Sequence, residues 1–143
     1  MKISELASAG KCTTETVRFY EKAGLLPPAE RTSSNYRSYG AKHVESLRFI
    51  RNCRALDMAH AEIRTLQGLI DAPAQGCGAI NDLLDEHIGH VDARIAELLR
   101  LKGQLHELRL QCQSEHTVDA CGILHGLAAM ETEARHERQS HLG

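Results

Sequence analysis

The most constraining feature of this chain is an apolar repeat between residues 81 and 111. Its members are spaced alternately four and three residues apart, as in a coiled-coil seam, and are Leu84, Ile88, Val91, Ile95 and Leu98. A helix of about 31 residues is roughly 45 Å long. Because the rest of the chain is too small to cover so long an apolar stripe, we predict that this helix forms a homodimer. Folding back onto its own domain is the alternative.

Composition favours helices in the rest of the chain as well. The 143 residues include no Trp, two Phe and three Tyr, and the apolar residues are mostly Leu, Ala and Ile. Residues 1–25 predict two short helices with a tight connection, a helix-turn-helix. The polar stretch 26–40 predicts a loop or two-stranded wing, and periodicity over 41–69 predicts a second helix pair. The predicted fold is therefore mainly α.

Charge is distributed unevenly along the chain, whose net charge is −2. Residues 1–54 contain ten Lys and Arg residues against five Asp and Glu, a balance of +5. Residues 55–143 contain seven against fourteen, a balance of −7. A basic first third favours a polyanion such as DNA as its partner, whereas the acidic remainder would be repelled by it.

The N-terminal segment MKISELASAG lacks the apolar region of a secretory signal, and no stretch approaches the 18 apolar residues of a membrane span. We therefore expect a cytoplasmic protein with no membrane partner. Thiols stay reduced in that compartment, which disfavours a structural disulfide and favours metal or redox chemistry for the cysteines.

Three of the five cysteines lie near the two ends of the predicted long helix. Cys77 comes just before it, and Cys112 and Cys121 lie beyond it in the segment CQSEHTVDAC. Within one chain about 50 Å would separate Cys77 from Cys112 if the helix is straight. In an antiparallel dimer the start of one helix lies beside the end of the other. Cys77 would then meet Cys112 and Cys121 of the partner subunit.

Three converging thiolates would form a soft site of low coordination number, suited to Pb(II), Cd(II) or Hg(II) rather than Mg(II) or Ca(II). Zinc prefers four ligands, and His116 inside the loop or a water could supply the fourth. The alternative for Cys112 and Cys121 is burial as small apolar side chains, because free cysteines are often buried and inert.

The remaining cysteines and histidines favour structural roles. Cys12 and Cys53 fall inside the predicted N-terminal helical domain and are interpreted as packing residues. His87 and His90 are three residues apart near the start of the long helix, where a solvated helix surface is the simpler interpretation. The histidines of the polar tail 131–143 could add a weak second metal site, with simple fraying of a terminus as the alternative.

Three segments, TVRFYEKAGLLPP, NYRSYG and LRFIRNCRALDM, strongly resemble the MerR family of metal- and stress-responsive transcriptional regulators. The likeness extends from Met1 to about Leu127. The segments CGAINDLLDEHI and CGIL resemble the lead- and cadmium-responsive branch of that family. One departure is Ala59, where relatives often have a Thr that caps the helix and pairs with the acid at Glu62. Its loss would weaken the helix start by roughly 1 kcal/mol.

The resemblance implies a metal site made of Cys77 from one subunit and Cys112 and Cys121 from the other, with Pb(II) or Cd(II) as the effector. Mercury- and zinc-responsive members share all three cysteine positions, so Hg(II) and Zn(II) remain alternatives. The resemblance implies five regions in chain order. They are a winged helix-turn-helix DNA-binding domain (1–70), a linker (71–80), an antiparallel coiled-coil dimerisation helix (81–111), a metal-binding loop with a short helix (112–130) and a polar tail (131–143).

The resemblance also implies DNA contacts from the first domain. We expect Thr13, Thr14 and Arg18 to lie on or just before the recognition helix and to face the major groove and its flanking phosphates. The family positions that contact the DNA backbone correspond to Tyr20, Arg31, Tyr36, Arg37 and Tyr39. Arginine and tyrosine suit this role because guanidinium groups bridge phosphate oxygens and phenols donate hydrogen bonds to them. Ordinary packing in the wing is the alternative for Tyr36 and Tyr39.

The implied function is that of a transcriptional regulator and not of an enzyme. Relatives act on promoters whose two polymerase elements are too far apart and out of phase with each other. The metal-bound dimer kinks and untwists the double-stranded DNA so that RNA polymerase can engage both elements, at a bending cost on the order of 1 to 6 kcal/mol. Two other hypotheses are a regulator that senses thiol oxidation through a Cys112–Cys121 disulfide, and a metal-buffering or thiol enzyme. No CxxC motif or spaced Cys-His pair supports the enzyme.

Overall fold

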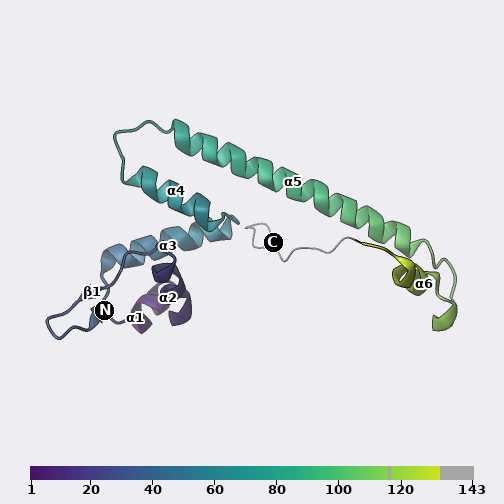
Figure 1. Cartoon of the computed structure of the whole chain (residues 1–143), viewed down its shortest axis with the longest axis horizontal. Helices are drawn as coiled ribbons and strands as arrows, with labels where there is room; N and C mark the ends of the chain where they lie inside the picture. Colours follow the sequence, from purple (N-terminus) through teal and green to yellow (C-terminus); the bar gives the residue numbers. More distant parts are fainter. Residues whose placement is uncertain (116, 133–143) are drawn as a thin grey trace. The chain divides into compact units, whose positions relative to one another are not determined.

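The computed structural model describes residues 1–115 and 117–132 and divides into two compact units, Met1–Leu83 and the chain from Leu84 onward. The predicted mainly helical fold, with a helix-turn-helix, a small wing and one long helix, is confirmed (Figure 1). In chain order the elements are α1 (Ile3–Ala9), α2 (Thr14–Lys22), β1 (Glu30–Arg31), β2 (Arg37–Ser38), α3 (Ala41–Ala55), α4 (His60–Ile70), α5 (Gly78–Arg109), the 3-10 turn η1 (Val118–Ala120) and α6 (Gly122–Ala129).

Local signals define the helix-turn-helix formed by α1 and α2. Thr13 caps α2, because its hydroxyl oxygen accepts a hydrogen bond from the Thr16 amide at 3.1 Å. The turn between the helices packs closely on α3, since a Cβ atom at Gly10 would overlap the side chain of Leu47. After α2 the chain turns at Gly24, whose φ of 78° lies in the left-handed region that favours glycine. This turn directs Leu25 into the core.

The wing is a two-stranded antiparallel hairpin in which Glu30 pairs with Ser38 and Arg31 with Arg37. Its loop is closed by hydrogen bonds to Thr32, whose amide donates to the Tyr36 carbonyl oxygen at 2.9 Å. Asn35 supplies the left-handed residue of this turn, with φ of 64°, a conformation that asparagine adopts more readily than most residues. The polar stretch 26–40 therefore forms the predicted hairpin.

Helices α3 and α4 are separated at the predicted interruption, where Asp57 has a positive φ of 59°. Ala59 caps α4 without a side-chain acceptor, as its sequence requires. The Glu62 carboxylate nevertheless accepts a hydrogen bond from the Ala59 amide at 2.9 Å. Half of the reciprocal capping arrangement is thus retained even though the side chain at the capping position is a methyl group.

The core of the first unit joins all four of its helices and the wing. Its fully buried side chains are Leu6, Val17, Leu26, His43, Leu47, Ile50 and Ile63. His43 is satisfied there as a neutral ring, because Nδ1 accepts from the Gly40 amide at 3.0 Å and Nε2 donates to the Pro28 carbonyl oxygen at 3.1 Å. Cys53 belongs to this core and Cys12 packs against it, and burial raises the pKa of both thiols.

The long helix α5 contains 32 residues and begins at Gly78, three residues before the predicted start at 81. Its seam is uncovered in the single chain, since Ile88, Ile95 and Leu105 are each at least half exposed. So many exposed apolar side chains at coiled-coil spacing are typical of a helix that pairs with another chain. No helix in the described part of the chain is long and apolar enough to cross a membrane.

Helix α6 folds back onto the end of α5 through two glycines. A Cβ atom at Gly122 would overlap the Gln111 carbonyl oxygen, and one at Gly126 would overlap the Gln111 side chain. The approach is therefore close enough that only glycine fits without a shift. Because Cys112 follows Gln111 and Cys121 precedes Gly122, this packing brings the two cysteines together.

Candidate metal centre and DNA interface

The described residues bring together two of the three predicted thiol ligands. Cys112 and Cys121 lie close enough for each side chain to shift the pKa of the other, and both are partly exposed. The Cys112 thiol donates a hydrogen bond to the Ser114 carbonyl oxygen at 3.4 Å. Cys112 lies at the end of α5, where its carbonyl oxygen accepts from the Arg109 guanidinium at 2.6 Å. Cys121 is the residue directly before α6. Eight intervening residues therefore form a loop whose two ends present adjacent sulfur atoms.

The two thiols have opposite pKa shifts. The backbone amides of Leu124 and Ile123, at the first turn of α6, lower the pKa of Cys121 below the ordinary 9.0, because they donate hydrogen bonds that favour the thiolate. The neighbouring Cys121 side chain raises the pKa of Cys112 above 9.0. The thiolate form is therefore favoured more at Cys121 than at Cys112. Thiolates are the form that binds soft metal ions.

The third predicted ligand, Cys77, lies in the first unit. It is exposed and lies directly before α5, where its carbonyl oxygen accepts from the Asn81 amide at 3.0 Å. The 32 residues of α5 lie between Cys77 and Cys112 in the sequence. The fourth candidate, His116, and residues 133–143 of the tail lie outside the described residues.

Four of the predicted DNA contacts line one basic hollow of about 460 Å³ on the first unit. The hollow is lined by Lys2, Ile3, Arg18, Arg31, Asn35, Tyr36 and Arg37. Arg18 comes from the second helix of the helix-turn-helix, and the others come from the wing and the start of α1. Tyr36 is 73 % exposed. Four cations around an exposed phenol form a surface suited to phosphate oxygens.

The structure gives the other predicted DNA residues different positions. Thr13 and Thr14 lie at the start of α2, and the Thr13 hydroxyl already caps that helix. Tyr20 and Tyr39 are core residues, with 9 % and 2 % of their surfaces exposed. The Tyr39 hydroxyl donates to Glu21 at 2.8 Å. Both rings therefore pack in the core, and the contact of these residues with the DNA backbone stays a prediction.

Three residues of the basic hollow, Lys2, Ile3 and Asn35, were missing from the sequence prediction. Lys2 belongs to the basic first third of the chain, so its charge is visible in the sequence, but its position beside the wing is not. Asn35 is visible only as a turn residue. Its carbonyl oxygen accepts from the Arg31 guanidinium at 3.2 Å, which orients Arg31 within the hollow. Lys2 comes beside the wing because the Met1 amino group donates to the Tyr39 carbonyl oxygen at 2.6 Å and the Tyr39 amide donates to the Met1 carbonyl oxygen at 2.9 Å.

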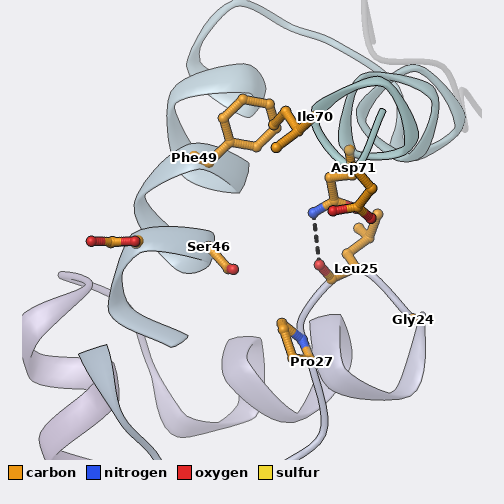
Figure 2. A pocket seen from close by; sticks show the side chains of 9 residues that line it. Gly24, Leu25, Pro27, Ser46, Phe49, Ile70 and Asp71 are labelled. Atoms are coloured by element: carbon orange, nitrogen blue, oxygen red, sulfur yellow. Dashed lines mark hydrogen bonds between the residues drawn. The ribbon is translucent and has the colours of Figure 1, made fainter. Parts of the chain in front are cut away.

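A second, larger hollow of about 490 Å³ lies between α3, α4 and the turn after α2 (Figure 2). Phe49 and Ile70 line it (Figure 2). Gln67, another lining residue, donates from Nε2 to the Leu25 carbonyl oxygen at 2.7 Å. Glu45 and Asp71 also line it. Carboxylates beside an apolar wall are less suited to phosphate oxygens than the cations of the basic hollow.

Family models match most of the chain. Residues 1–68 match the MerR HTH family regulatory protein model, and residues 44–108 match the model described as MerR, DNA binding. The chain is 50 % identical to an HTH-type transcriptional regulator ZntR homolog of Haemophilus influenzae over 109 residues, which cover 76 % of this chain and 81 % of that protein.

Two further relatives extend the similarity toward the C-terminus. The mercuric resistance operon regulatory protein of Bacillus cereus is 32 % identical over 126 residues, covering 88 % of this chain and 96 % of that protein. The solved structure of PbrR691 from Ralstonia metallidurans CH34 in complex with lead(II) is 46 % identical, with a TM-score of 0.79 over 89 % of this chain and 98 % of that one. The chain therefore belongs to the MerR family of DNA-binding transcriptional regulators and is not an enzyme.

Proposed function

We propose that the protein is a metal-responsive regulator that binds promoter DNA as a homodimer and detects a soft divalent metal through three cysteines. The observation that carries the proposal is the Cys112–Cys121 pair, which the close approach of Gly122 to Gln111 brings together and in which the pKa of Cys121 is lowered. Two adjacent thiols with partial exposure can bind a soft ion without any rearrangement of the core.

The third ligand is Cys77 of the partner subunit. Cys77 adjoins one end of α5 and Cys112 the other, so an antiparallel pair of α5 helices places the two ends of different chains side by side. The exposed apolar seam of α5 supports such pairing. Each dimer then holds two equivalent sites, each completed by both chains.

Pb(II) or Cd(II) is the effector that fits this ligand set, with Hg(II) or Zn(II) as the alternative. Three sulfur ligands favour large, soft ions over zinc, which usually takes four ligands. The similarity to a protein solved with lead(II) supports lead, whereas the similarities to a mercuric resistance regulator and to a ZntR homolog keep the other metals open.

Activation follows from the coupling of this site to the DNA. Residues 71–77 connect the winged domain to α5, and the proposed site joins the start of one α5 to the end of the other. Occupation of the site would favour one arrangement of the dimer over another and so favour bent and untwisted promoter DNA. Bending costs on the order of 1 to 6 kcal/mol, so the metal must prefer the activating state by a comparable amount. RNA polymerase then engages both promoter elements.

A mixed dimer tests whether the site is shared between chains. One variant carries Cys77→Ser and the other carries Cys112→Ser with Cys121→Ser, and they bear different affinity tags. Neither homodimer can complete a three-thiol site. In the heterodimer the second variant supplies Cys77 to the intact loop of the first, which restores one site of two. About half of the wild-type metal stoichiometry is expected, with the ultraviolet absorption of metal thiolates.

Equal binding of Pb(II) and Cd(II) by the heterodimer and by the two parent homodimers would refute the shared site. Competitive titration with Pb(II), Cd(II), Hg(II) and Zn(II), followed by transcription from the cognate promoter, identifies the effector. A different function, sensing of thiol oxidation, is favoured by the contact between Cys112 and Cys121. It needs no third cysteine, so a transcriptional response to peroxide that survives Cys77→Ser would support it.

A further inference from the structure

A second basic hollow, of about 340 Å³, lies at the end of α1 opposite to the hollow around Arg18. It is lined by Ala9, Gly10, Lys11, Arg48, Arg51 and Asn52. Lys11 belongs to the turn of the helix-turn-helix, whereas Arg48 and Arg51 are three residues apart on α3 and therefore share one face of that helix. Three cations from two separate segments meet here, and no carboxylate lines the hollow.

Tertiary contacts hold the turn firmly against α3. The Arg51 guanidinium donates to the Gly10 carbonyl oxygen at 2.5 Å. Gly10 itself is buried against Leu47 so closely that a Cβ atom would overlap that side chain. The amides of Lys11 and Cys12 donate to the carbonyl oxygens of Ser8 and Ala7 at 3.1 and 3.0 Å. The backbone that carries Lys11 is therefore fixed in place beside Arg48 and Arg51.

Lys11 occupies a backbone conformation that lysine rarely adopts. Its φ is 55°, in the left-handed region, where glycine or asparagine would be less strained. Such strain persists only where the surrounding structure imposes it, and it often marks a functional position. The side chain at this position is exposed and cationic. A cation is thus held at the turn against the conformational preference of the residue.

The charges of this cluster are not neutralised within the described part of the chain. The ion pairs found there join Lys42 to Glu30 and Arg94 to Glu97, and neither involves the hollow. Arg51 is close enough to Cys12 for its charge to act on the pKa of that thiol. Three exposed cations this close repel one another, and an anion placed among them would relieve the repulsion.

We propose that Lys11, Arg48 and Arg51 form a second contact with DNA backbone phosphates, on the other side of α1 from the hollow around Arg18. In a helix-turn-helix the first helix crosses the DNA backbone while the second enters the major groove. The hollow around Arg18 includes Lys2 and Ile3 at the start of α1, and the second hollow includes Ala9 and Gly10 at its end. Basic surfaces therefore lie at both ends of the helix that crosses the backbone.

The test is the salt dependence of DNA binding, and it rests on the proposed promoter binding. A duplex is first selected from a random-sequence pool by the wild-type protein, and its affinity is measured by fluorescence anisotropy over a range of salt concentrations. Lys11→Gln with Arg48→Gln should make the slope of log K against log salt shallower by about 0.9 for each phosphate that is no longer neutralised, or about 1.8 per chain. Preference among sequences should not change, because phosphates carry no base information.

The matched control removes two exposed cations from α5 by Arg100→Gln with Lys102→Gln, which should leave the slope unchanged. A third variant, Lys11→Gly, removes the charge and relaxes the backbone at φ 55°. It should weaken DNA binding while the unfolding temperature stays at or above that of the wild type. A wild-type slope in the Lys11 and Arg48 variant would overturn the inference alone. Failure of the wild-type protein to bind any duplex would overturn promoter binding as well.

Discussion

Cys112 and Cys121 lie close enough to shift each other's pKa although eight residues separate them, and the amides of the first turn of α6 lower the pKa of Cys121. This relationship makes the two thiols chemically unequal in the free protein. Cys121 loses its proton at a lower pH than Cys112, because the pKa of Cys121 is lowered and that of Cys112 is raised.

Thiol alkylation should reveal this inequality. Iodoacetamide at pH 7 to 8 is expected to label Cys121 before Cys112, because the pKa of Cys121 lies below 9.0 and that of Cys112 above it. In the Cys121→Ser variant the pKa of Cys112 should fall toward 9.0, since the neighbouring thiolate is gone. Peptide mass spectrometry of timed samples gives both rates. Equal labelling of the two thiols in the wild-type protein would contradict the arrangement.

Metal affinity should rise with pH. Each thiol that is still protonated must release a proton when the metal binds, so log K increases by about one unit per pH unit for each such thiol. The rise should continue until the raised pKa of Cys112 is passed. Cys121, whose pKa is lowered, stops contributing to the slope of log K against pH at a lower pH than Cys112. Competition with a chelator of known affinity at several pH values measures the slope, and a flat profile would exclude thiol ligands.

Substitution should separate ligand cysteines from packing cysteines. Cys77→Ser, Cys112→Ser and Cys121→Ser are each expected to abolish metal-induced transcription while DNA binding by the metal-free protein remains, because thiolate ligands act as a set. Cys12 packs against the core and Cys53 lies in it, so Cys12→Ser and Cys53→Ser should lower the free energy of unfolding but keep the transcriptional response to metal. A promoter-reporter assay with thermal unfolding of each variant distinguishes the groups. Activation that persists without one cysteine removes that cysteine from the site.

Arg18→Ala and Tyr36→Ala should weaken operator binding and leave dimer formation and metal affinity unchanged, because both side chains line the exposed basic hollow of the first unit. Removing an interaction with a phosphate or base is expected to cost roughly 1 to 3 kcal/mol. If Arg18 reaches a base edge, its substitution should also relax sequence preference. Tyr39→Phe serves as the comparison variant, because the hydroxyl that it removes belongs to a buried residue and donates a hydrogen bond to Glu21. Unchanged operator affinity in both alanine variants would refute this reading surface.

Gly122→Ala should weaken metal binding without preventing the formation of α5. A Cβ atom there would overlap the Gln111 carbonyl oxygen, so the loop and Cys121 must move. Gly103→Ala is the matched control, because no atom lies within 4 Å of the new Cβ and alanine favours the helix by about 1 kcal/mol. Circular dichroism and metal titration of both variants separate the effects. Unaltered metal affinity in Gly122→Ala would show that the loop tolerates the shift.

Periodicity, capping residues and turn residues determine the order and type of the elements without help from distant contacts. The seam of α5, the hydroxyl cap at Thr13 and the glycine of the turn at Gly24 act within a few residues of their own positions. The interruption between α3 and α4 is likewise local, at Asp57. For this reason the helix-turn-helix, the wing and the long helix can be read from the sequence.

Tertiary structure decided which residues meet. Tyr20 and Tyr39 resemble DNA contacts in the sequence, yet packing against the helices buries both rings. Lys11 and Arg51 are forty residues apart in the sequence, and the close packing of Gly10 against Leu47 brings them to one hollow. Cys121 reaches Cys112 only because Gly122 and Gly126 let α6 approach Gln111. Each of these placements depends on contact between segments that are distant in the chain, and spacing along a sequence does not encode such contact.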